Sequence, residues 1–176
     1  MLHDEYRVEH TTIADLEIIY WLFDEALIYQ QKRGFPVWNG YDKEVIKTDI
    51  EQRLQFKVLI SMDILCVFSI CLNDPVIWRE KNQGDAVYLH RIVVNPNFKG
   101  QKQFEKVLTW AKKYARDKNL KYIRMDTWAE NDNIIQYYKS FGFQFIEDFT
   151  NPDTLELPVQ NRNLKIALLE MDLDNV

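Results

Sequence analysis

The sequence is poor in the residues that build loop-rich, disulfide-stapled or metal-centred proteins. Its 176 residues include five Gly, five Pro, two Cys and three His. With 47% hydrophobic and 28% charged residues, the chain is neither fibrous nor disordered, and its composition is typical of a compact globular protein. The three histidines show no zinc-type spacing with either cysteine, so we expect no metal site.

The two cysteines are not expected to form a disulfide. Cys66 and Cys71 lie in one strand-like run, Leu65 to Leu72, and their odd separation points them to opposite faces of a strand. We interpret both as small apolar core residues.

Long apolar runs are also missing. A membrane-spanning helix needs roughly 18 uninterrupted apolar residues, and acidic residues from Asp15 to Glu25 interrupt the most hydrophobic early segment. Met1 to His10 also lacks a basic region followed by an apolar one, so we expect no signal peptide. The sequence therefore predicts a cytoplasmic protein without a membrane partner, folded as a single domain over residues 1–176.

Charge is distributed unevenly. The chain carries 22 basic and 27 acidic residues, a net charge of -5, yet Lys99 to Lys121 holds eight Lys/Arg against two acidic residues, which is +6 and leaves -11 for the rest. A nucleic-acid surface is one interpretation, but the aromatic residues of this segment lie mostly on the expected core face of a helix. We therefore expect a solvated helix face and no nucleic-acid partner.

Hydrophobic periodicity and turn residues divide the chain into seven strands and four helices. Thr12 and Asp15 form a capping-box pattern at the start of the first helix, and Gly142 follows the last helix in the usual position. In chain order we expect strand Tyr6–His10, helix Ile13–Gln31, helix Asp42–Gln55, strands Phe56–Ser61, Leu65–Leu72 and Ala86–Val94, a helix from Phe104 to Lys118, strand Tyr122–Thr127, helix Asp132–Phe141, and strands Phe143–Phe149 and Leu164–Leu173.

This order, βααβββαβαββ, indicates the α/β (α+β) class, with a mixed central sheet of about seven strands flanked by four helices. The helix between Val87–Val94 and Tyr122–Thr127 makes these two strands parallel neighbours joined by a right-handed crossover. The turn after Val94 therefore lies at the carboxyl edge of the sheet, where ligands bind in open α/β sheets.

Two motifs follow the strand that ends at Val94. The first is a Val94-x-Pro96 turn leading through Lys99 and Gly100 into a helix, whose free amides and dipole can hold phosphate oxygens, although an ordinary turn also needs a glycine. The second combines Asn131, Tyr137-Tyr138 and Gly142-Phe143 around a short helix. Taken alone, Asn131 is an N-cap and Tyr138 a core residue.

Together these motifs resemble those of the GNAT superfamily of acyl-CoA-dependent N-acyltransferases. The second motif matches closely. The first matches in part, because Lys102 and Phe104 occupy positions where that family usually has glycine or alanine. The resemblance implies a GNAT-like fold, acetyl-CoA as the acyl donor, and direct attack by an amine without a covalent enzyme intermediate.

The resemblance also implies roles for individual residues. Tyr138 would protonate the departing thiolate, and Asn131 would contact the cofactor arm. Backbone groups at the end of the strand that closes with Val94 would bind the pantetheine arm. Amides of the turn that follows this strand would bind the pyrophosphate. These cofactor-binding residues are Ile92, Val93, Val94, Lys99, Gly100, Gln101, Lys102, Gln103, Phe104, Asn131 and Tyr138.

The general base and the acceptor are less sharply defined. His90 and Asp126 are the two candidates for the base, each with an alternative structural role. Trp38 and Tyr41 are candidates for binding the acceptor, which we expect to be a cationic amine of a small molecule or peptide. A non-catalytic CoA-binding or interaction module with the same fold remains an alternative, and the protein is expected to be a monomer or homodimer.

Overall fold

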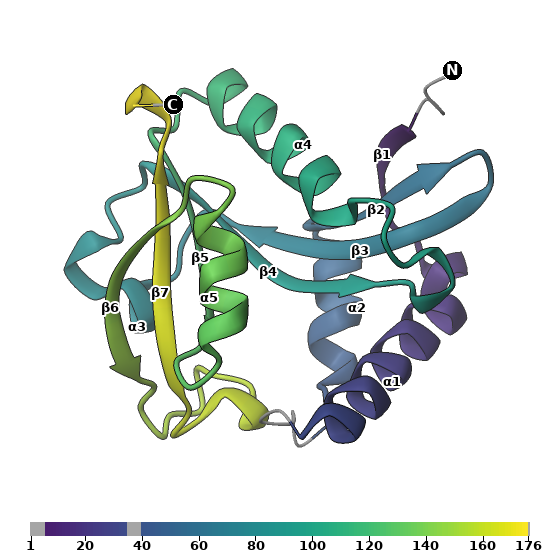
Figure 1. Cartoon of the computed structure of the whole chain (residues 1–176), viewed down its shortest axis with the longest axis horizontal. Helices are drawn as coiled ribbons and strands as arrows, with labels where there is room; N and C mark the ends of the chain where they lie inside the picture. The colour runs from purple at the N-terminus through teal and green to yellow at the C-terminus, as the bar shows by residue number, and fades with distance from the viewer. Residues whose placement is uncertain (1–5, 35–39, 176) are drawn as a thin grey trace. The chain divides into compact units, whose positions relative to one another are not determined.

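The computed structural model describes residues 6–34 and 40–175, and within them it contains seven strands and five α-helices (Figure 1). The strands are β1 (Tyr6–His10), β2 (Gln55–Ile60), β3 (Asp63–Cys71), β4 (Ala86–Val94), β5 (Tyr122–Trp128), β6 (Gln144–Thr150) and β7 (Lys165–Asp172). The helices are α1 (Leu16–Arg33), α2 (Lys43–Glu51), α3 (Pro75–Trp78), α4 (Gln103–Asp117) and α5 (Asp132–Lys139).

The strands form one mixed sheet in the order β1-β2-β3-β4-β5-β7-β6. Strands β4 and β5 pair in parallel, whereas β1 with β2, β2 with β3, β5 with β7 and β6 with β7 pair antiparallel. The mixed seven-stranded sheet of the α/β class and the parallel pair predicted from the sequence are therefore confirmed.

The chain divides into two compact units. The first consists of Met1–Ser69 and Arg91–Trp110, and the second of Ile70–His90 and Ala111–Val176. Both β3 and β4 contribute residues to each unit. The single domain expected over residues 1–176 stays a prediction.

In the first unit two helices, α1 and α2, pack on one face of β3, and α4 packs on the other. Val67 packs in one core cluster with Ile19, Leu22 and Phe23 of α1 and with Ile46 and Ile50 of α2. The next residue, Phe68, points the other way and lies 5.1 Å, centroid to centroid, from Trp110 of α4. Because Trp110 packs in this way and Phe104 is buried, these aromatic side chains of the basic segment face the core, as the sequence predicted.

In the second unit α3 packs over the sheet. Its Trp78 is fully buried beside Tyr88 of β4, in a cluster with Ile166 and Leu168 of β7, which lies between β5 and β6 (Figure 1). Arg124 of β5 is buried in the same region. Its Nε donates to Glu170 at 2.7 Å. Glu170 is also the residue opposite Arg124 in the β5–β7 register.

One helix was missing from the predicted elements, and the end of another was predicted wrongly. The segment at Pro75 was interpreted only as a break, but Pro75 opens the four-residue α3, since proline fits the first turn of a helix. The second predicted helix ends at Glu51 rather than Gln55. Arg53 adopts a left-handed φ of 58° there, and the Leu54 amide donates to the Asp49 carbonyl, which ends the helix.

Cys66 and Cys71 are both free, which confirms that they do not pair. Over the described ranges, every helix is too short or too polar to cross a membrane.

Candidate active site

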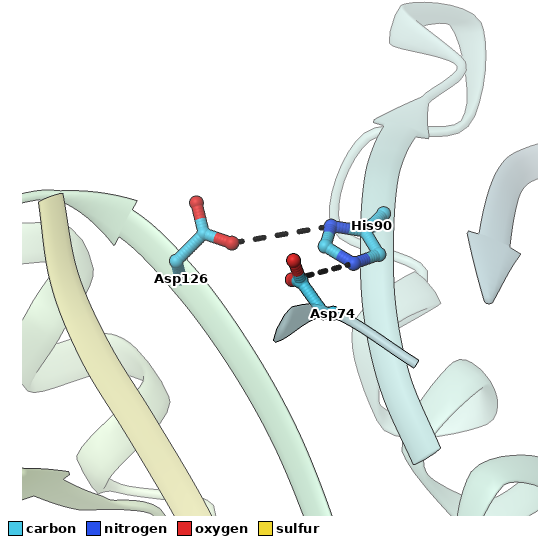
Figure 2. A group of neighbouring side chains, drawn as sticks. All are labelled: Asp74, His90 and Asp126. Atoms are coloured by element: carbon cyan, nitrogen blue, oxygen red, sulfur yellow. Dashed lines mark ion pairs between the residues drawn. The ribbon is translucent and has the colours of Figure 1, made fainter. Parts of the chain in front are cut away.

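Three ionisable side chains meet where the parallel pairing of β4 and β5 ends. The ladder consists of four pairs, from Ala86↔Tyr122 to Leu89↔Met125. His90 and Asp126 are the next residues on the two strands, so the pairing brings these two residues together. Asp74 joins them from the turn between β3 and α3 (Figure 2). We call these three residues the acid–histidine cluster.

The imidazole of His90 lies between the two carboxylates. Its Nε2 is 3.4 Å from Oδ2 of Asp74, and its Nδ1 is 3.9 Å from Oδ1 of Asp126 (Figure 2). Burial of the ring lowers its pKa, but Asp74 and then Cys71 outweigh this effect and raise the pKa of His90 to about 10. The ring is therefore protonated at neutral pH in the free protein.

The cluster has the residue types of a metal site but not a suitable arrangement. Its three ligand atoms lie within 4.8 Å of one another. The two carboxylates, however, face opposite nitrogens of the ring, so one ion bound to either nitrogen would be directed away from one of them. The contacts instead suit an imidazolium that attracts a carboxylate at each N–H. The expected lack of a metal stays a prediction.

Tyr138 lies within electrostatic reach of the same cluster. Burial, then Tyr137 and Asp126, raise the pKa of Tyr138, so its hydroxyl keeps its proton and can act as an acid. Helix α5, which carries Tyr138, begins at Asn131, whose side-chain oxygen accepts the Ile134 amide at 3.2 Å. Asn131 is therefore the N-cap that its position also suggested, and its contact with a cofactor arm stays a prediction.

Directly after His90 the backbone of β4 departs from regular strand geometry. Arg91 has a left-handed φ of 49°, and its Nε donates to the Asp49 carboxylate of α2 at 3.1 Å. Ser69 donates to the same Asp49 oxygen at 2.7 Å. Such a conformation is costly for a residue other than glycine, and these bonds help to hold it.

The predicted pantetheine-binding residues follow Arg91. Of these, Val93 points into the α1–α2 core cluster, whereas the Val94 side chain is exposed. Ile92 is half-buried.

The predicted pyrophosphate turn contains two left-handed residues. Gly100 has a φ of 84° and Lys102 a φ of 54°, and both are exposed. A Cβ at Gly100 would have no atom within 4 Å, so glycine is favoured there by its conformation rather than by space. A backbone in which left-handed residues alternate with residues of ordinary conformation forms a concave array of amides, and such arrays bind anions.

The side chains of this turn divide between solvent and core. Lys99 lies 5.8 Å from the ring centroid of Tyr29, and Lys102 forms an exposed ion pair with Glu105 at 3.3 Å. The Gln101 carbonyl accepts from Lys106 at 2.6 Å. Gln103 and Phe104 are buried, and the Gln103 side chain donates to the Phe98 carbonyl. Because Phe104 is buried, its side chain does not fill the exposed face of the turn, where the pyrophosphate is predicted to bind.

Of the two predicted acceptor-binding residues, the structure describes only Tyr41. Trp38 lies outside the described residues. Tyr41 is half-buried against Phe23, with ring centroids 5.0 Å apart, and its hydroxyl donates to Asp24 at 2.8 Å. Its contact with an acceptor stays a prediction.

The structure also shows a pocket that the sequence did not suggest. It has a volume of about 480 Å³ in the first unit, between α1, the start of β3 and the turn after β4. Its lining residues are Ile18, Trp21, Met62, Asp63, Ile64, Asn95, Asn97 and Phe98. They come from three separate segments, and no short motif could have indicated them.

Asp74 is the functional candidate that sequence reasoning missed. Its Asn-Asp-Pro setting is an ordinary turn signal. A clue existed in the helix-start position of Asp74, because an aspartate there usually caps the helix with its side chain. The Asp74 side chain makes no such bond and faces His90 instead.

Known proteins that this chain resembles in sequence or structure are described as acetyltransferases. Residues 68–143 match the family model of the acetyltransferase (GNAT) family. An uncharacterized N-acetyltransferase of Bacillus subtilis is 25% identical over 160 residues, covering 80% of this chain and 89% of that protein. A GNAT-family acetyltransferase structure from Listeria monocytogenes has a TM-score of 0.78 at 20% identity and covers 95% of this chain and 94% of its own. A Salmonella typhimurium structure determined with its cofactor acetyl-CoA has a TM-score of 0.65 at 16% identity and covers 97% and 95% of the two chains.

The strand order and the likeness to GNAT-family structures show that the chain has the GNAT fold. The match over residues 68–143 agrees with the GNAT resemblance of the two motifs, and the similar protein of Bacillus subtilis is likewise described as an N-acetyltransferase.

Proposed function

We propose that the protein transfers the acetyl group of acetyl-CoA to a primary amine of a small molecule or peptide by direct attack on the thioester. The observation that carries this proposal is the meeting of three residues selected for their chemistry. His90 and Asp126 are ion-paired at the end of the β4–β5 ladder, and Tyr138 lies within electrostatic reach of Asp126. These three residues can supply both proton transfers that the reaction needs, which are deprotonation of the ammonium and protonation of the thiolate.

The proton transfers follow from the charges of these groups. The acceptor arrives as an ammonium ion and must lose a proton, directly or through water, to the acid–histidine cluster before its nitrogen can attack. The collapsing intermediate then releases the CoA thiolate, which takes the proton of Tyr138. With its pKa raised, Tyr138 is protonated at the pH where this step occurs.

The acceptor proposed here is a cation. The cluster holds two carboxylates around one imidazolium, so its net charge is negative, and the chain outside the segment Lys99 to Lys121 carries -11. A negative site raises the local concentration of ammonium groups and disfavours acidic acceptors.

The cofactor would be held by the first motif. Backbone groups of Ile92 to Val94 would bind the pantetheine arm, and amides from Lys99 to Phe104 would bind the pyrophosphate at the start of α4. The left-handed residues Gly100 and Lys102 support this assignment, because they shape a concave backbone. A cytoplasmic location and a monomeric or homodimeric state remain part of the proposal.

Replacement of Tyr138 by Phe tests the proposed chemistry. We expect kcat to fall by roughly 100-fold or more, the contribution of a positioned acid, because the thiolate loses its proton donor. Thiol release is measured with acetyl-CoA and a panel of alkyl amines and peptide amino termini. Binding of acetyl-CoA, followed by the rise in Tm that it causes, should be retained.

Tyr137→Phe is the matched control, since Tyr137 is the neighbouring tyrosine of the same helix and is 46% exposed. It should leave kcat within a few-fold of the parent. Equal turnover in the Tyr138 and Tyr137 variants would refute the acid role. Acetyl-CoA binding without turnover of any amine would favour the non-catalytic module instead.

A further inference from the structure

Asp74 occupies a helix-start position without acting as a cap. Its backbone is held firmly, because its amide donates to Asn82 Oδ1 at 2.9 Å and its carbonyl accepts the Trp78 amide at 2.9 Å. Its carboxylate makes no capping bond to α3. The Oδ2 atom is buried and has no hydrogen-bond partner in residues 6–34 and 40–175 beyond its ion pair with His90. A buried carboxylate oxygen usually has a hydrogen-bond partner, and here the group paired with it is the ring of His90.

The two carboxylates of the cluster are not equivalent. Asp74 is nearer to the ring and more enclosed, with its side chain 11% exposed against 23% for Asp126. A neutral imidazole has only one N–H, and the closer and better shielded carboxylate attracts it more strongly. The neutral ring therefore keeps its proton on Nε2, facing Asp74, and presents its Nδ1 lone pair on the side of Asp126.

We propose that Asp74 is the positioning residue of the acetyl-transfer site, which holds the Nε2 proton of His90 so that Nδ1 accepts the proton of the acceptor ammonium. This inference rests on the proposed function. In the step, one N–H bond of the ammonium breaks and its electron pair stays on the amine nitrogen, while a new N–H bond forms at Nδ1. The ring becomes an imidazolium, and its extra proton later passes to solvent.

The strength of His90 as a base suits this step. An alkyl ammonium has a pKa of roughly 10.4, so an ordinary imidazole near about 6.5 would accept its proton only with a large energetic penalty. Asp74 and Cys71 raise the pKa of His90 to about 10, so that donor and acceptor are nearly matched, which favours proton transfer. The ring accepts the proton in those molecules in which it is neutral, and their share grows as the pH rises toward the pKa of His90. The groups that act on the ring are thus Asp74, Cys71 and Asp126, and Asp126 also acts electrostatically on Tyr138.

The first test does not depend on activity. The pKa and tautomer of His90 are measured by NMR titration of the ring nitrogens and carbons in the parent, Asp74→Asn and Asp15→Asn proteins, with His90→Gln to assign the signal. We expect Asp74→Asn to lower the pKa of His90 by roughly one to three units, as for loss of a nearby opposite charge, and to mix the two tautomers.

Asp15→Asn is the matched control because it removes a carboxylate from a similarly enclosed ion pair, with Lys57, outside the cluster. It should leave the His90 titration unchanged. An unchanged His90 titration in Asp74→Asn would overturn the proposal, whether or not an acceptor has been found.

The second test uses the pH dependence of kcat/KM for an accepted amine. In Asp74→Asn the acid limb of the profile should move to lower pH together with the pKa of His90. The plateau should fall by roughly 10- to 100-fold, part of what a positioned base contributes. KM for acetyl-CoA should be unchanged. Loss of rate by the same factor at every pH, with no shift of the limb, would show a merely structural role and overturn the proposal.

Two further variants keep these tests decisive. Asp74→Glu keeps the charge and should restore much of the raised His90 pKa. Asp74→Ser keeps a residue that caps helices well, and it replaces Asp74→Asn if that variant does not fold. If no amine is acetylated while the NMR titration behaves as expected, the proposed function fails but the pairing of Asp74 with His90 stands.

Discussion

Removal of the buried Arg124 cation should be among the most destabilising single changes in the second unit. Arg124 is 4% exposed. Its Nε donates to Glu170 at 2.7 Å, and its Nη1 donates to the Lys81 carbonyl at 2.7 Å. It also lies 4.9 Å from the ring centroid of Trp78 and 4.7 Å from that of Tyr122. Arg124→Met keeps most of the apolar volume and removes every polar contact.

The magnitude follows from what the substitution leaves behind. Glu170, with its side chain 19% exposed, would become a largely enclosed carboxylate without its cation, and breaking such a pair typically costs about 3–5 kcal/mol. For a chain of this size each kcal/mol lowers Tm by about 2–4 °C, so a loss of roughly 6–20 °C is expected. Glu170→Gln in the Arg124→Met background should recover part of this loss, because the orphaned charge is then removed.

Urea unfolding followed by far-UV circular dichroism measures these free energies, with the m-value as a check on two-state behaviour. Lys113→Met is the control, since Lys113 pairs with Asp117 on the surface with both side chains well exposed, and such pairs contribute about 0–1 kcal/mol. A loss below about 1 kcal/mol in Arg124→Met would refute the reasoning, and so would a double variant no more stable than the single one.

Two further predictions concern the cofactor turn and acid stability. Lys102→Gly should lower KM for acetyl-CoA several-fold in steady-state assays, because glycine adopts the left-handed φ of Lys102 without strain. Gly100→Ala should raise KM for acetyl-CoA, because alanine adopts the left-handed φ of Gly100 only with strain. Unchanged KM values in both variants would argue against a role of this turn in cofactor binding. Burial raises the pKa of Asp15, but bonds from Lys57 and Thr12 outweigh this and leave it below its ordinary value. The stabilisation by Asp15 is therefore present above the pKa of Asp15 in the unfolded state, and it is lost as the pH falls through the lowered pKa of the folded state. Asp15→Asn should flatten the fall in the free energy of unfolding between about pH 5 and 2, as measured by urea unfolding. An unchanged fall would contradict the stabilising role of the Asp15–Lys57 pair.

Much of the fold follows from local sequence pattern. The β4 strand was predicted with the bounds Ala86–Val94 that it has, because a run of branched and aromatic residues between turns specifies a strand. The short helix α3 was missed because four residues are too few to show a helical period. Helix α2 ended early because its last turn is closed by backbone bonds around Arg53, which residue type alone does not reveal.

The candidate site could be predicted only in part. His90, Asp126 and Tyr138 were identified from residue chemistry and from motif spacing, and the structure brings His90 and Asp126 to one place. Asp74 could not be identified in this way. It lies in a turn signal whose usual role is to start a helix, and only the position of His90 explains the direction of its carboxylate.

The sequence by itself determined the order of the strands and of the longer helices, the parallel pairing of β4 with β5 and the two motifs that resemble those of the GNAT superfamily. It could do so because periodicity, turn chemistry and crossover handedness act over short stretches of chain. Only the tertiary structure decided that His90 stands between Asp74 and Asp126. That arrangement depends on where the β4–β5 ladder ends and on how the turn before α3 packs beside it, and both are set by contacts between segments far apart in the chain.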